Sequence, residues 1–220
     1  MLGGRVKIRA FGGLANRLRV VLSYRHTFGP IEIVWRPDGE IAHGRFADVF
    51  EPIDGVTFLD EGWCGTKTLD PYPHAKDGWR LRYRDLKLKP EHAERVKELR
   101  DRQPYAAMHV RRTDHVQLAK EMGGYIEDDE YVAWADGFTM PVFLATDNAR
   151  TQASFINRAR VFTAGPITLD SWEGGQRNTT LARSAIDLVT CVHAKDFKGC
   201  RESSFTNLVQ TMRDLECAGY

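Results

Sequence analysis

Residues 105–114 read Tyr-Ala-Ala-Met-His-Val-Arg-Arg-Thr-Asp, and this stretch decides the fold class. Its first six residues form a short, continuous apolar run, which is typical of a parallel strand buried on both faces. Polar residues follow at once where such a strand would end. Because ligands of open parallel sheets bind beyond the carboxyl ends of the strands, the stretch predicts a polar site as well as a buried strand.

Strands and helices alternate along the rest of the chain. Further strands are predicted for residues 6–11, 31–35, 56–59, 141–145 and 160–163, with a short one at Phe197. Helices are predicted after Gly12-Gly13, from Pro90 to about residue 102, after residues 128–130, from Thr179 or Thr180, and from Ser203-Ser204. Residues 60–89 are expected to form long loops with one short strand. This alternation predicts an α/β protein with parallel sheets in two lobes, residues 1–102 and 103–220.

The composition narrows the range of partners and compartments. The net charge of +1 favours neither nucleic acid nor a membrane surface, so any anion site has to be local. The four cysteines form no CxxC pair and no zinc-like spacing, which favours reduced thiols. The amino terminus lacks an apolar signal core, and no window approaches the roughly 18 apolar residues of a membrane-spanning helix. We therefore expect a cytoplasmic protein without a membrane span.

The polar cluster at and just beyond the end of the strand at 105–110 contains His109, Arg111, Arg112 and Asp114. Adjacent arginines at a strand end point to opposite sides, so one of the two is expected to face a ligand. A guanidinium group presents two parallel N–H donors that match two phosphate oxygens, and it stays charged at any working pH. The alternative is that both arginines are solvated or pair with Asp114.

Two other polar clusters follow predicted elements in the second lobe. Asp147 stands just beyond the strand at 141–145, where a carboxylate can accept hydrogen bonds from a guanine edge or from ribose hydroxyls. Ser203 and Ser204 begin the last helix, whose free N–H groups and positive end suit an anion. The alternative for each cluster is an ordinary turn or helix cap.

In the first lobe, the turn after residues 6–11 carries Gly13, Asn16 and Arg17. It differs from the dinucleotide fingerprint because Arg17 occupies the position of the third glycine. The turn nevertheless places helix-start N–H groups, Asn16 and Arg17 near a ligand, although a tight turn alone would explain the glycines. No Asp-x-Asp or HExxH sequence occurs in the chain, so no metal site and no cofactor are expected.

The order of these clusters resembles the fucosyltransferase superfamily that includes α-1,6-, nodulation and protein O-fucosyltransferases. In the α-1,6 group a His-Val-Arg-Arg-Thr/Gly-Asp motif is similar to residues 109–114, and a later Leu-Ala-Thr-Asp motif is similar to residues 144–147. An Asn/Thr-rich stretch leading into Ile-Asp-Leu resembles residues 177–188, and a final Ser-Ser resembles residues 203–204. The Gly-Gly-Leu-Ala-Asn-Arg turn at residues 12–17 resembles the Gly-Gly-x-x-Asn entry of these families.

The resemblance implies a GT-B-like fold of two Rossmann-like lobes, here a minimal version with a reduced first, acceptor-side lobe. It implies an inverting, metal-independent transfer of fucose from GDP-fucose to a hydroxyl of a glycan or another acceptor. The second lobe would hold GDP, with Arg111 on the β-phosphate, His109 in the nucleotide pocket, Asp147 on guanine, and Ser203 and Ser204 on phosphate. The glutamate proposed as base in the α-1,6 enzymes has no ungapped counterpart. Glu121, one short gap away, or else Asp114, is the candidate base.

Three alternatives remain open at this point. The same fold could use another GDP-sugar or another nucleotide sugar, because the motifs address the diphosphate and base more than the sugar. It could also be a nucleotide- or glycan-binding module without turnover, or a purely structural α/β protein. The acceptor is undefined. The aromatic residues of the 60–89 stretch would suit stacking on sugar rings or packing within the lobe; they are Trp63, Tyr72, Trp79 and Tyr83.

Overall fold

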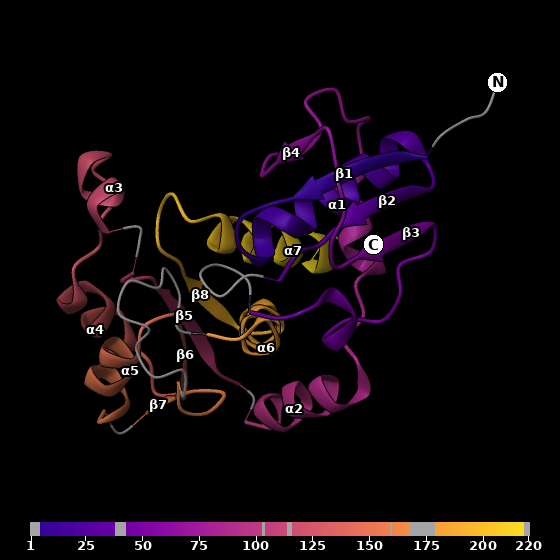
Figure 1. Ribbon diagram of the computed structural model, residues 1–220. Helices are drawn as coiled ribbons and strands as arrows, with labels where there is room; N and C mark the ends of the chain where they lie inside the picture. Colours follow the sequence, from indigo (N-terminus) through magenta and orange to yellow (C-terminus); the bar gives the residue numbers. More distant parts are fainter. Residues whose placement is uncertain are drawn as a thin grey trace. The chain divides into compact units, whose positions relative to one another are not determined.

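The computed structural model describes residues 5–37, 43–102, 104–113, 116–158, 160–167 and 179–217 (Figure 1). The chain divides into two compact units, Met1–Pro90 and Glu91–Tyr220. This division lies before helix α2 (Pro90–Arg100), whereas the sequence places the boundary after residue 102. Each unit is built around one parallel sheet, which confirms the predicted α/β class with two Rossmann-like lobes.

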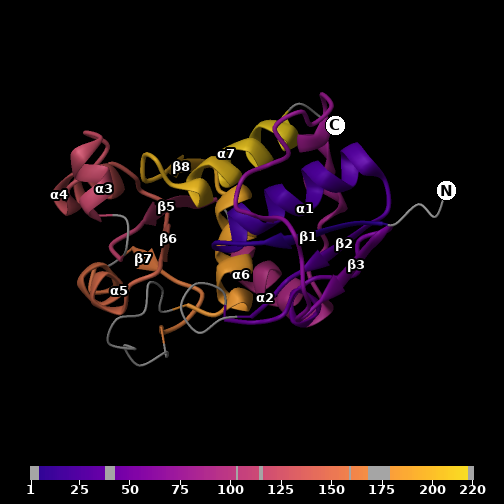
Figure 2. The same cartoon turned by 45° about the horizontal axis from the view of Figure 1, so that its top comes forward.

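The first unit holds a four-stranded parallel sheet in the order β3-β2-β1-β4. Its elements follow the chain as β1 (Val6–Ala10), α1 (Leu14–Phe28), β2 (Ile31–Val34), the 3-10 helix η1 (Phe46–Asp48), β3 (Val56–Leu59), β4 (Lys67–Thr68) and the 3-10 helix η2 (Trp79–Asp85). Helix α1 lies along one side of β1 and β2 (Figure 2) and also packs against η2.

The two faces of this first sheet differ in chemistry. The strand register aligns Ile8 with Ile33, and both side chains are buried on the face that packs beneath α1. The same register aligns Lys7, Glu32 and Thr57 in one row on the opposite face. These three side chains are half-buried or exposed. The first sheet is therefore apolar on one side, while the other side, called the polar face below, carries these polar residues together with the buried Val34.

The second unit repeats this strand order as β7-β6-β5-β8, again all parallel. After α2 its elements are β5 (Ala106–Val110), α3 (Val116–Glu121), α4 (Asp128–Asp136), β6 (Val142–Thr146), α5 (Ala149–Ile156), β7 (Val161–Phe162), α6 (Leu181–Val192), β8 (Asp196–Lys198) and α7 (Ser204–Cys217).

Helices cover both faces of the second sheet. Every residue of β5 and β6 is buried, as the apolar run at residues 105–110 predicts. On one face, Met108 and Leu144 join a core with Tyr131 of α4 and Phe155 of α5. Helix α6 packs against β5 and β6 from the other side, and Figure 1 shows the sheet between α6 and the pair α4 and α5. A polar group beyond β5 or β6 is thus held by rigid strands.

The predicted elements differ from the observed ones at several element ends and in the short helices. The helix from Pro90 ends at Arg100, and the strand expected at 160–163 is limited to Val161–Phe162. Helix α3 and the 3-10 helix η2 were not predicted. Both are short, and η2 buries only Trp79 and Tyr83, so neither produces the 3.6-residue apolar period that identifies a longer helix.

Candidate functional site

The carboxyl ends of β5 and β6 bring two of the predicted polar clusters together. Thr113 Oγ1 donates a hydrogen bond to Asp147 Oδ2 at 2.6 Å, and the backbone N–H of Arg112 donates to Asp147 Oδ1 at 3.3 Å. Arg111 Nε lies 3.7 Å from Asp147 Oδ2. Asp147 therefore fixes the conformation of residues 111–113, a structural task in addition to the guanine contact expected from the sequence.

Arg111 is the arginine whose surroundings suit an anionic ligand. The residue is only 8% exposed, and the Asp147 carboxylate beside it keeps its guanidinium in place. A charge-assisted interaction is stronger when water is excluded, because the local dielectric constant is lower. The arrangement therefore fixes a guanidinium group, with little exposure to water, at the edge of the sheet where ligands of parallel α/β folds bind.

Arg112 has a different task, although it too was expected at the nucleotide. Its Nη2 donates to Asp128 Oδ1 and to the carbonyl of Ile126, each at 2.6 Å. Its guanidinium also stacks on the ring of Tyr125, 4.6 Å from the centroid. These contacts tie the start of α4 to the end of β5. Arg112 thus holds the structure together, and the expectation that one arginine of the pair faces a ligand stays a prediction.

His109 connects β5 to the first turn of α7. Its Nδ1 lies 2.9 Å from Thr206 Oγ1, and its ring packs on Phe205 with centroids 4.6 Å apart. Thr206 Oγ1 also accepts a hydrogen bond from the N–H of Cys200. A Cβ at Gly199 would collide with the Thr206 side chain, so a glycine is required for this close approach. His109 thus sets the position of the α7 start beside the end of β5.

The start of α7 contains a buried hydroxyl with no hydrogen-bond partner in the described part of the chain. Ser203 is 0% exposed, and its Oγ makes no cap bond to the helix. The ordinary alternative of serine capping therefore does not account for this side chain. A buried polar atom without a partner costs free energy, which a ligand oxygen could recover. Ser204 follows as the first residue of α7, where backbone N–H groups have no partner within the helix.

In the first unit, the glycine turn after β1 separates Asn16 from Arg17. Gly12 adopts a φ of 84°, the left-handed region that favours glycine, whereas Gly13 has an ordinary extended backbone at the N-cap of α1. Asn16 Oδ1 is buried and has no hydrogen-bond partner among the described residues. Asn16 is therefore the residue of this turn that keeps a hydrogen-bonding group for a ligand.

Arg17 was expected to contact the nucleotide, and the structure gives it structural contacts instead. The residue is 1% exposed. Its guanidinium donates to the carbonyls of Gly12 at 2.7 Å and Arg36 at 2.8 Å and lies over the Trp35 ring. The physical reason is that the first helical turn faces the core of the unit here. Arg17 stabilises the turn that carries Asn16.

Of the two candidate bases, Glu121 is among the residues that the structure describes. Glu121 is the last residue of α3, is exposed, and accepts a hydrogen bond from Gln117 Nε2 at 2.8 Å. Asp114 lies outside the described residues. Glu121 is thus available to solvent as a carboxylate on a short helix that follows the arginine segment in the chain.

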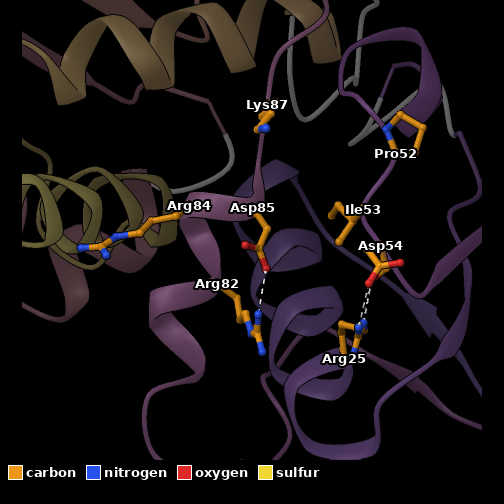
Figure 3. A pocket seen from close by; sticks show the side chains of 8 residues that line it. All are labelled: Arg25, Pro52, Ile53, Asp54, Arg82, Arg84, Asp85 and Lys87. Atoms are coloured by element: carbon orange, nitrogen blue, oxygen red, sulfur yellow. Dashed lines mark hydrogen bonds and ion pairs between the residues drawn. The ribbon is translucent and has the colours of Figure 1, made fainter. Parts of the chain in front are cut away.

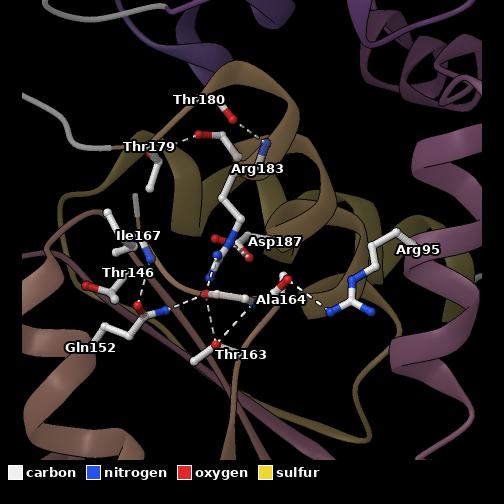
Figure 4. Close-up of polar contacts among 12 residues, drawn as sticks. Arg95, Thr146, Gln152, Thr163, Ala164, Ile167, Thr179, Thr180, Arg183 and Asp187 are labelled. Atoms are coloured by element: carbon white, nitrogen blue, oxygen red, sulfur yellow. Dashed lines mark hydrogen bonds and ion pairs between the residues drawn. The ribbon is translucent and has the colours of Figure 1, made fainter. Parts of the chain in front are cut away.

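A buried ion pair on α6 is the feature that the site prediction missed. Arg183 Nε donates to Asp187 Oδ1 at 2.8 Å, and Arg183 Nη1 donates to the carbonyl of Gly165 at 2.6 Å (Figure 4). Burial raises the pKa of Asp187 to about 6, against the opposing effect of Arg183. The available signal was an acidic residue directly between the apolar Ile186 and Leu188 in a helix with many buried residues.

Figure 4 also shows why this pair matters for the end of β7. Gln152 Nε2 and Thr163 Oγ1 donate to the same Gly165 carbonyl as Arg183. Gln152 Oε1 in turn accepts from the N–H of Ile167, so residues 163–167 are fixed to α5 and α6. This polar cluster shapes the carboxyl edge of the second sheet next to Thr146.

The first unit contains a cavity of about 500 Å³, but at the wrong end of its sheet for a parallel-sheet ligand site (Figure 3). It lies by the last turn of α1 and the residues just before β3, which is the amino edge of the strands. Within it Arg25 pairs with Asp54 and Arg82 pairs with Asp85. The paired charges give the cavity a mixed polar lining, and it is separate from Asn16 at the carboxyl edge.

The described residues contain no group of three or more His, Cys, Asp and Glu side chains that could hold a metal ion. In the same residues, no helix combines the length and apolar character needed to cross a membrane.

Comparison with known proteins gives structural matches and no sequence-level ones. No family model matches the chain, and no curated protein matches it either. The NodZ α-1,6-fucosyltransferase soaked with GDP-fucose superposes with a TM-score of 0.61 at 17% identity, over 95% of this chain and 93% of that one. POFUT1 in complex with GDP gives a TM-score of 0.59 at 12% identity, over 96% and 94%. The chain has a fucosyltransferase-like fold.

A second NodZ structure, from Bradyrhizobium, agrees, with a TM-score of 0.59 at 16% identity over 94% of this chain and 93% of that one. Identities this low establish the arrangement of strands and helices rather than the chemistry. The two four-stranded parallel sheets described above match the GT-B fucosyltransferase architecture.

Proposed function

We propose that this protein is a glycosyltransferase that moves fucose from GDP-fucose to a hydroxyl of an acceptor, without a metal ion and with inversion at the anomeric carbon. One observation carries the proposal. A buried arginine, Arg111, and a buried hydroxyl, Ser203, which has no hydrogen-bond partner among the described residues, both belong to the carboxyl edge of the second sheet. The structural neighbours include the NodZ α-1,6-fucosyltransferase soaked with GDP-fucose and POFUT1 in complex with GDP.

Each group has a role that follows from its chemistry. Arg111 neutralises the charge that builds on the departing diphosphate, a role that a metal ion plays in other transferases. Ser203 and the N–H groups of the α7 start hold phosphate oxygens, and the positive end of the helix favours the same charge. His109 keeps that helix start against β5. Asp147 orients Arg111 and offers its remaining lone pairs to the nucleotide.

The transfer is a direct displacement. The acceptor oxygen forms a bond to C1 of fucose while the bond between C1 and the β-phosphate oxygen breaks, and GDP leaves with the electron pair. The sugar passes through an oxocarbenium-like state. Glu121 accepts the acceptor proton in this scheme, and Asp114 is the second candidate.

The first experiment is a thermal-shift panel of GDP, UDP, ADP and CMP, each with EDTA and again with Mg²⁺. The proposal expects GDP to raise the melting temperature well above the other nucleotides, equally with and without metal, because a ligand that binds only the folded state stabilises it. Hydrolysis of GDP-fucose compared with GDP-mannose then identifies the sugar. Equal shifts with all four nucleotides, or none, would contradict the proposal.

The second candidate function is a nucleotide-binding module of the same fold without turnover. The specific observation in its favour is that Glu121 is exposed and engaged with Gln117 rather than held beside Arg111. Glu121→Gln separates the two: loss of turnover with unchanged GDP affinity supports a base. A parent protein that binds GDP but releases no fucose from GDP-fucose, with any acceptor, supports the module.

A further inference from the structure

The connection between β3 and β4 differs from its counterpart in the second unit. Both sheets have the same order, so the step from β3 to β4 corresponds to the step from β7 to β8. In the second unit this step contains α6, which covers one face of the sheet. In the first unit it is the short segment 60–66, which contains no helix. The first sheet thus lacks the covering helix on this side.

Segment 60–66 lies on the polar face of the first sheet. Cys64 Sγ donates to the carbonyl of Lys7, and a Cβ at Gly62 would lie 3.2 Å from Lys7 Nζ. Connections between parallel strands are right-handed, so a step back across the sheet runs over the face opposite α1. Both observations place the segment above the row of Lys7, Glu32 and Thr57.

Segment 60–66 presents an indole ring to solvent. Trp63 is 85% exposed, more than any other large apolar side chain of the described chain, the next being Met122 at 57%. The other aromatic residues of this stretch are used for packing. Tyr72 packs edge-on against Tyr24 and Phe28, and Trp79 packs against Tyr83. Of the four aromatics considered for sugar stacking, Trp63 is the one that remains available.

The strand residues of the polar face carry mainly positive charge. Arg5, Lys7 and Arg9 alternate with the buried residues of β1 and so share this face, and Lys67 stands next to Arg9 in the register. Glu32 is the acidic residue of the same strand rows; segment 60–66 adds the exposed Glu61 and Asp60, which pairs with Arg45. The polar strand residues with Trp63 are called the open face below.

We propose that the open face binds an acidic oligosaccharide, with one sugar ring stacked on Trp63. A pyranose has an apolar C–H face that suits an indole ring and a rim of hydroxyls that suits charged side chains. A carboxylate or sulfate on a neighbouring sugar reaches the accessible parts of Lys7 and Arg9 beside segment 60–66, where opposite charge is favourable. The binding does not depend on the proposed fucosyl transfer. The further statement that this glycan is the acceptor does rest on it.

Isothermal titration calorimetry tests the inference, with and without GDP, using a hyaluronan hexasaccharide as the acidic probe and maltohexaose as the neutral one. The parent protein is expected to bind the acidic probe more tightly. Trp63→Ala is expected to weaken binding about tenfold, and Trp63→Phe to retain it within about threefold, because an aromatic contact contributes roughly 0.5–1.5 kcal/mol. Met122→Ala, the matched exposed apolar control, should leave both affinities unchanged.

Charge is tested separately. Lys7→Glu should weaken binding of the acidic probe and leave binding of the neutral probe unchanged. Added salt should have the same selective effect. Chondroitin sulfate hexasaccharide, which carries uronate carboxylates like hyaluronan and sulfates in addition, is run beside it to show whether added sulfate strengthens binding. An open face that binds neither acidic probe, or a Trp63→Ala protein that binds them as the parent does, overturns the inference.

The two proposals fail in different ways. Loss of glycan binding with an intact GDP thermal shift overturns the open face and leaves the transferase proposal standing. Glycan binding without any GDP effect overturns the transferase and leaves the open face. Circular dichroism melting of each variant excludes unfolding as the cause, and Trp63 is exposed enough that its replacement should leave the melting temperature unchanged.

Discussion

The two sheets of this protein share one strand order and differ in how they are covered. In the second sheet every residue of β5 and β6 is buried, with helices on both faces. In the first sheet the row of Lys7, Glu32 and Thr57 stays at least partly accessible, because a short segment replaces the covering helix.

This difference corresponds to a difference in suitable ligands. A strand buried on both faces cannot shift without disturbing two packed layers, so the groups at its end keep their geometry. Such rigidity suits a small, highly charged ligand, because charges held in fixed positions can stabilise the charge that develops in a transition state. A sheet with one open face can accept a larger and more variable molecule. Under the proposed function, the second unit would bind the donor and the more accessible first sheet the acceptor.

The largest expected effect tests the rigid region. Arg111→Ala should lower kcat about 100-fold or more, because one preorganised charge partner of the leaving group is lost. Arg111→Lys should also be poor, since a point charge loses the two-pronged grip. Steady-state kinetics with GDP-fucose measures both. Arg158→Ala is the control, because this guanidinium lies in the same unit at the amino edge of β7. Near-normal turnover of Arg111→Ala would refute the site assignment.

Arg17, a buried arginine of the first unit, should affect stability rather than turnover. Arg17→Met should lower the free energy of unfolding by about 2–3 kcal/mol, because the buried carbonyls of Gly12 and Arg36 lose their donor. The folded fraction should keep its kcat, since Arg17 contacts no ligand in our scheme. Urea denaturation and kinetics per folded molecule measure the two effects. A kcat loss without a stability loss would place Arg17 at the ligand after all.

A pH effect tests the cluster at the end of β7. The pKa of Asp187 is about 6 in the folded protein and near 3.8 in the unfolded chain, so between these values the folded state holds the proton more tightly. The contribution of Asp187 to stability is therefore complete below about pH 4 and is lost as the pH rises to about 6, by about 3 kcal/mol. Asp187→Asn cannot titrate and should lack this change.

Urea denaturation of the parent and Asp187→Asn at several pH values between 4 and 7 gives the comparison. The difference in unfolding free energy between the two proteins should decline with rising pH. A constant difference across this range would show that Asp187 titrates in the folded protein as it does in the unfolded chain. Asp136→Asn, an exposed carboxylate of the same unit, is the control.

Local patterns predicted much of the fold and part of the site. The apolar run at 105–110 identified a strand buried on both faces, and the residues after it identified the carboxyl edge where Arg111 and Asp147 meet. The roles of Arg112 and Arg17 could not be predicted, because their partners Asp128 and Arg36 become neighbours only through folding. Asp187 was missed for a similar reason: its burial depends on how α6 packs.

The smallest expected effect concerns a single hydroxyl of the rigid region. Ser203→Ala removes an oxygen that has no partner in the described part of the chain, so stability should change by less than about 1 kcal/mol or rise slightly. GDP affinity should fall about tenfold, which corresponds to one hydrogen bond to a charged ligand at the low end of the usual range. Calorimetric titration with GDP and with guanosine separates the causes. A loss confined to GDP places the hydroxyl at a phosphate, whereas an equal loss with guanosine places it at the nucleoside and would move the diphosphate away from the α7 start.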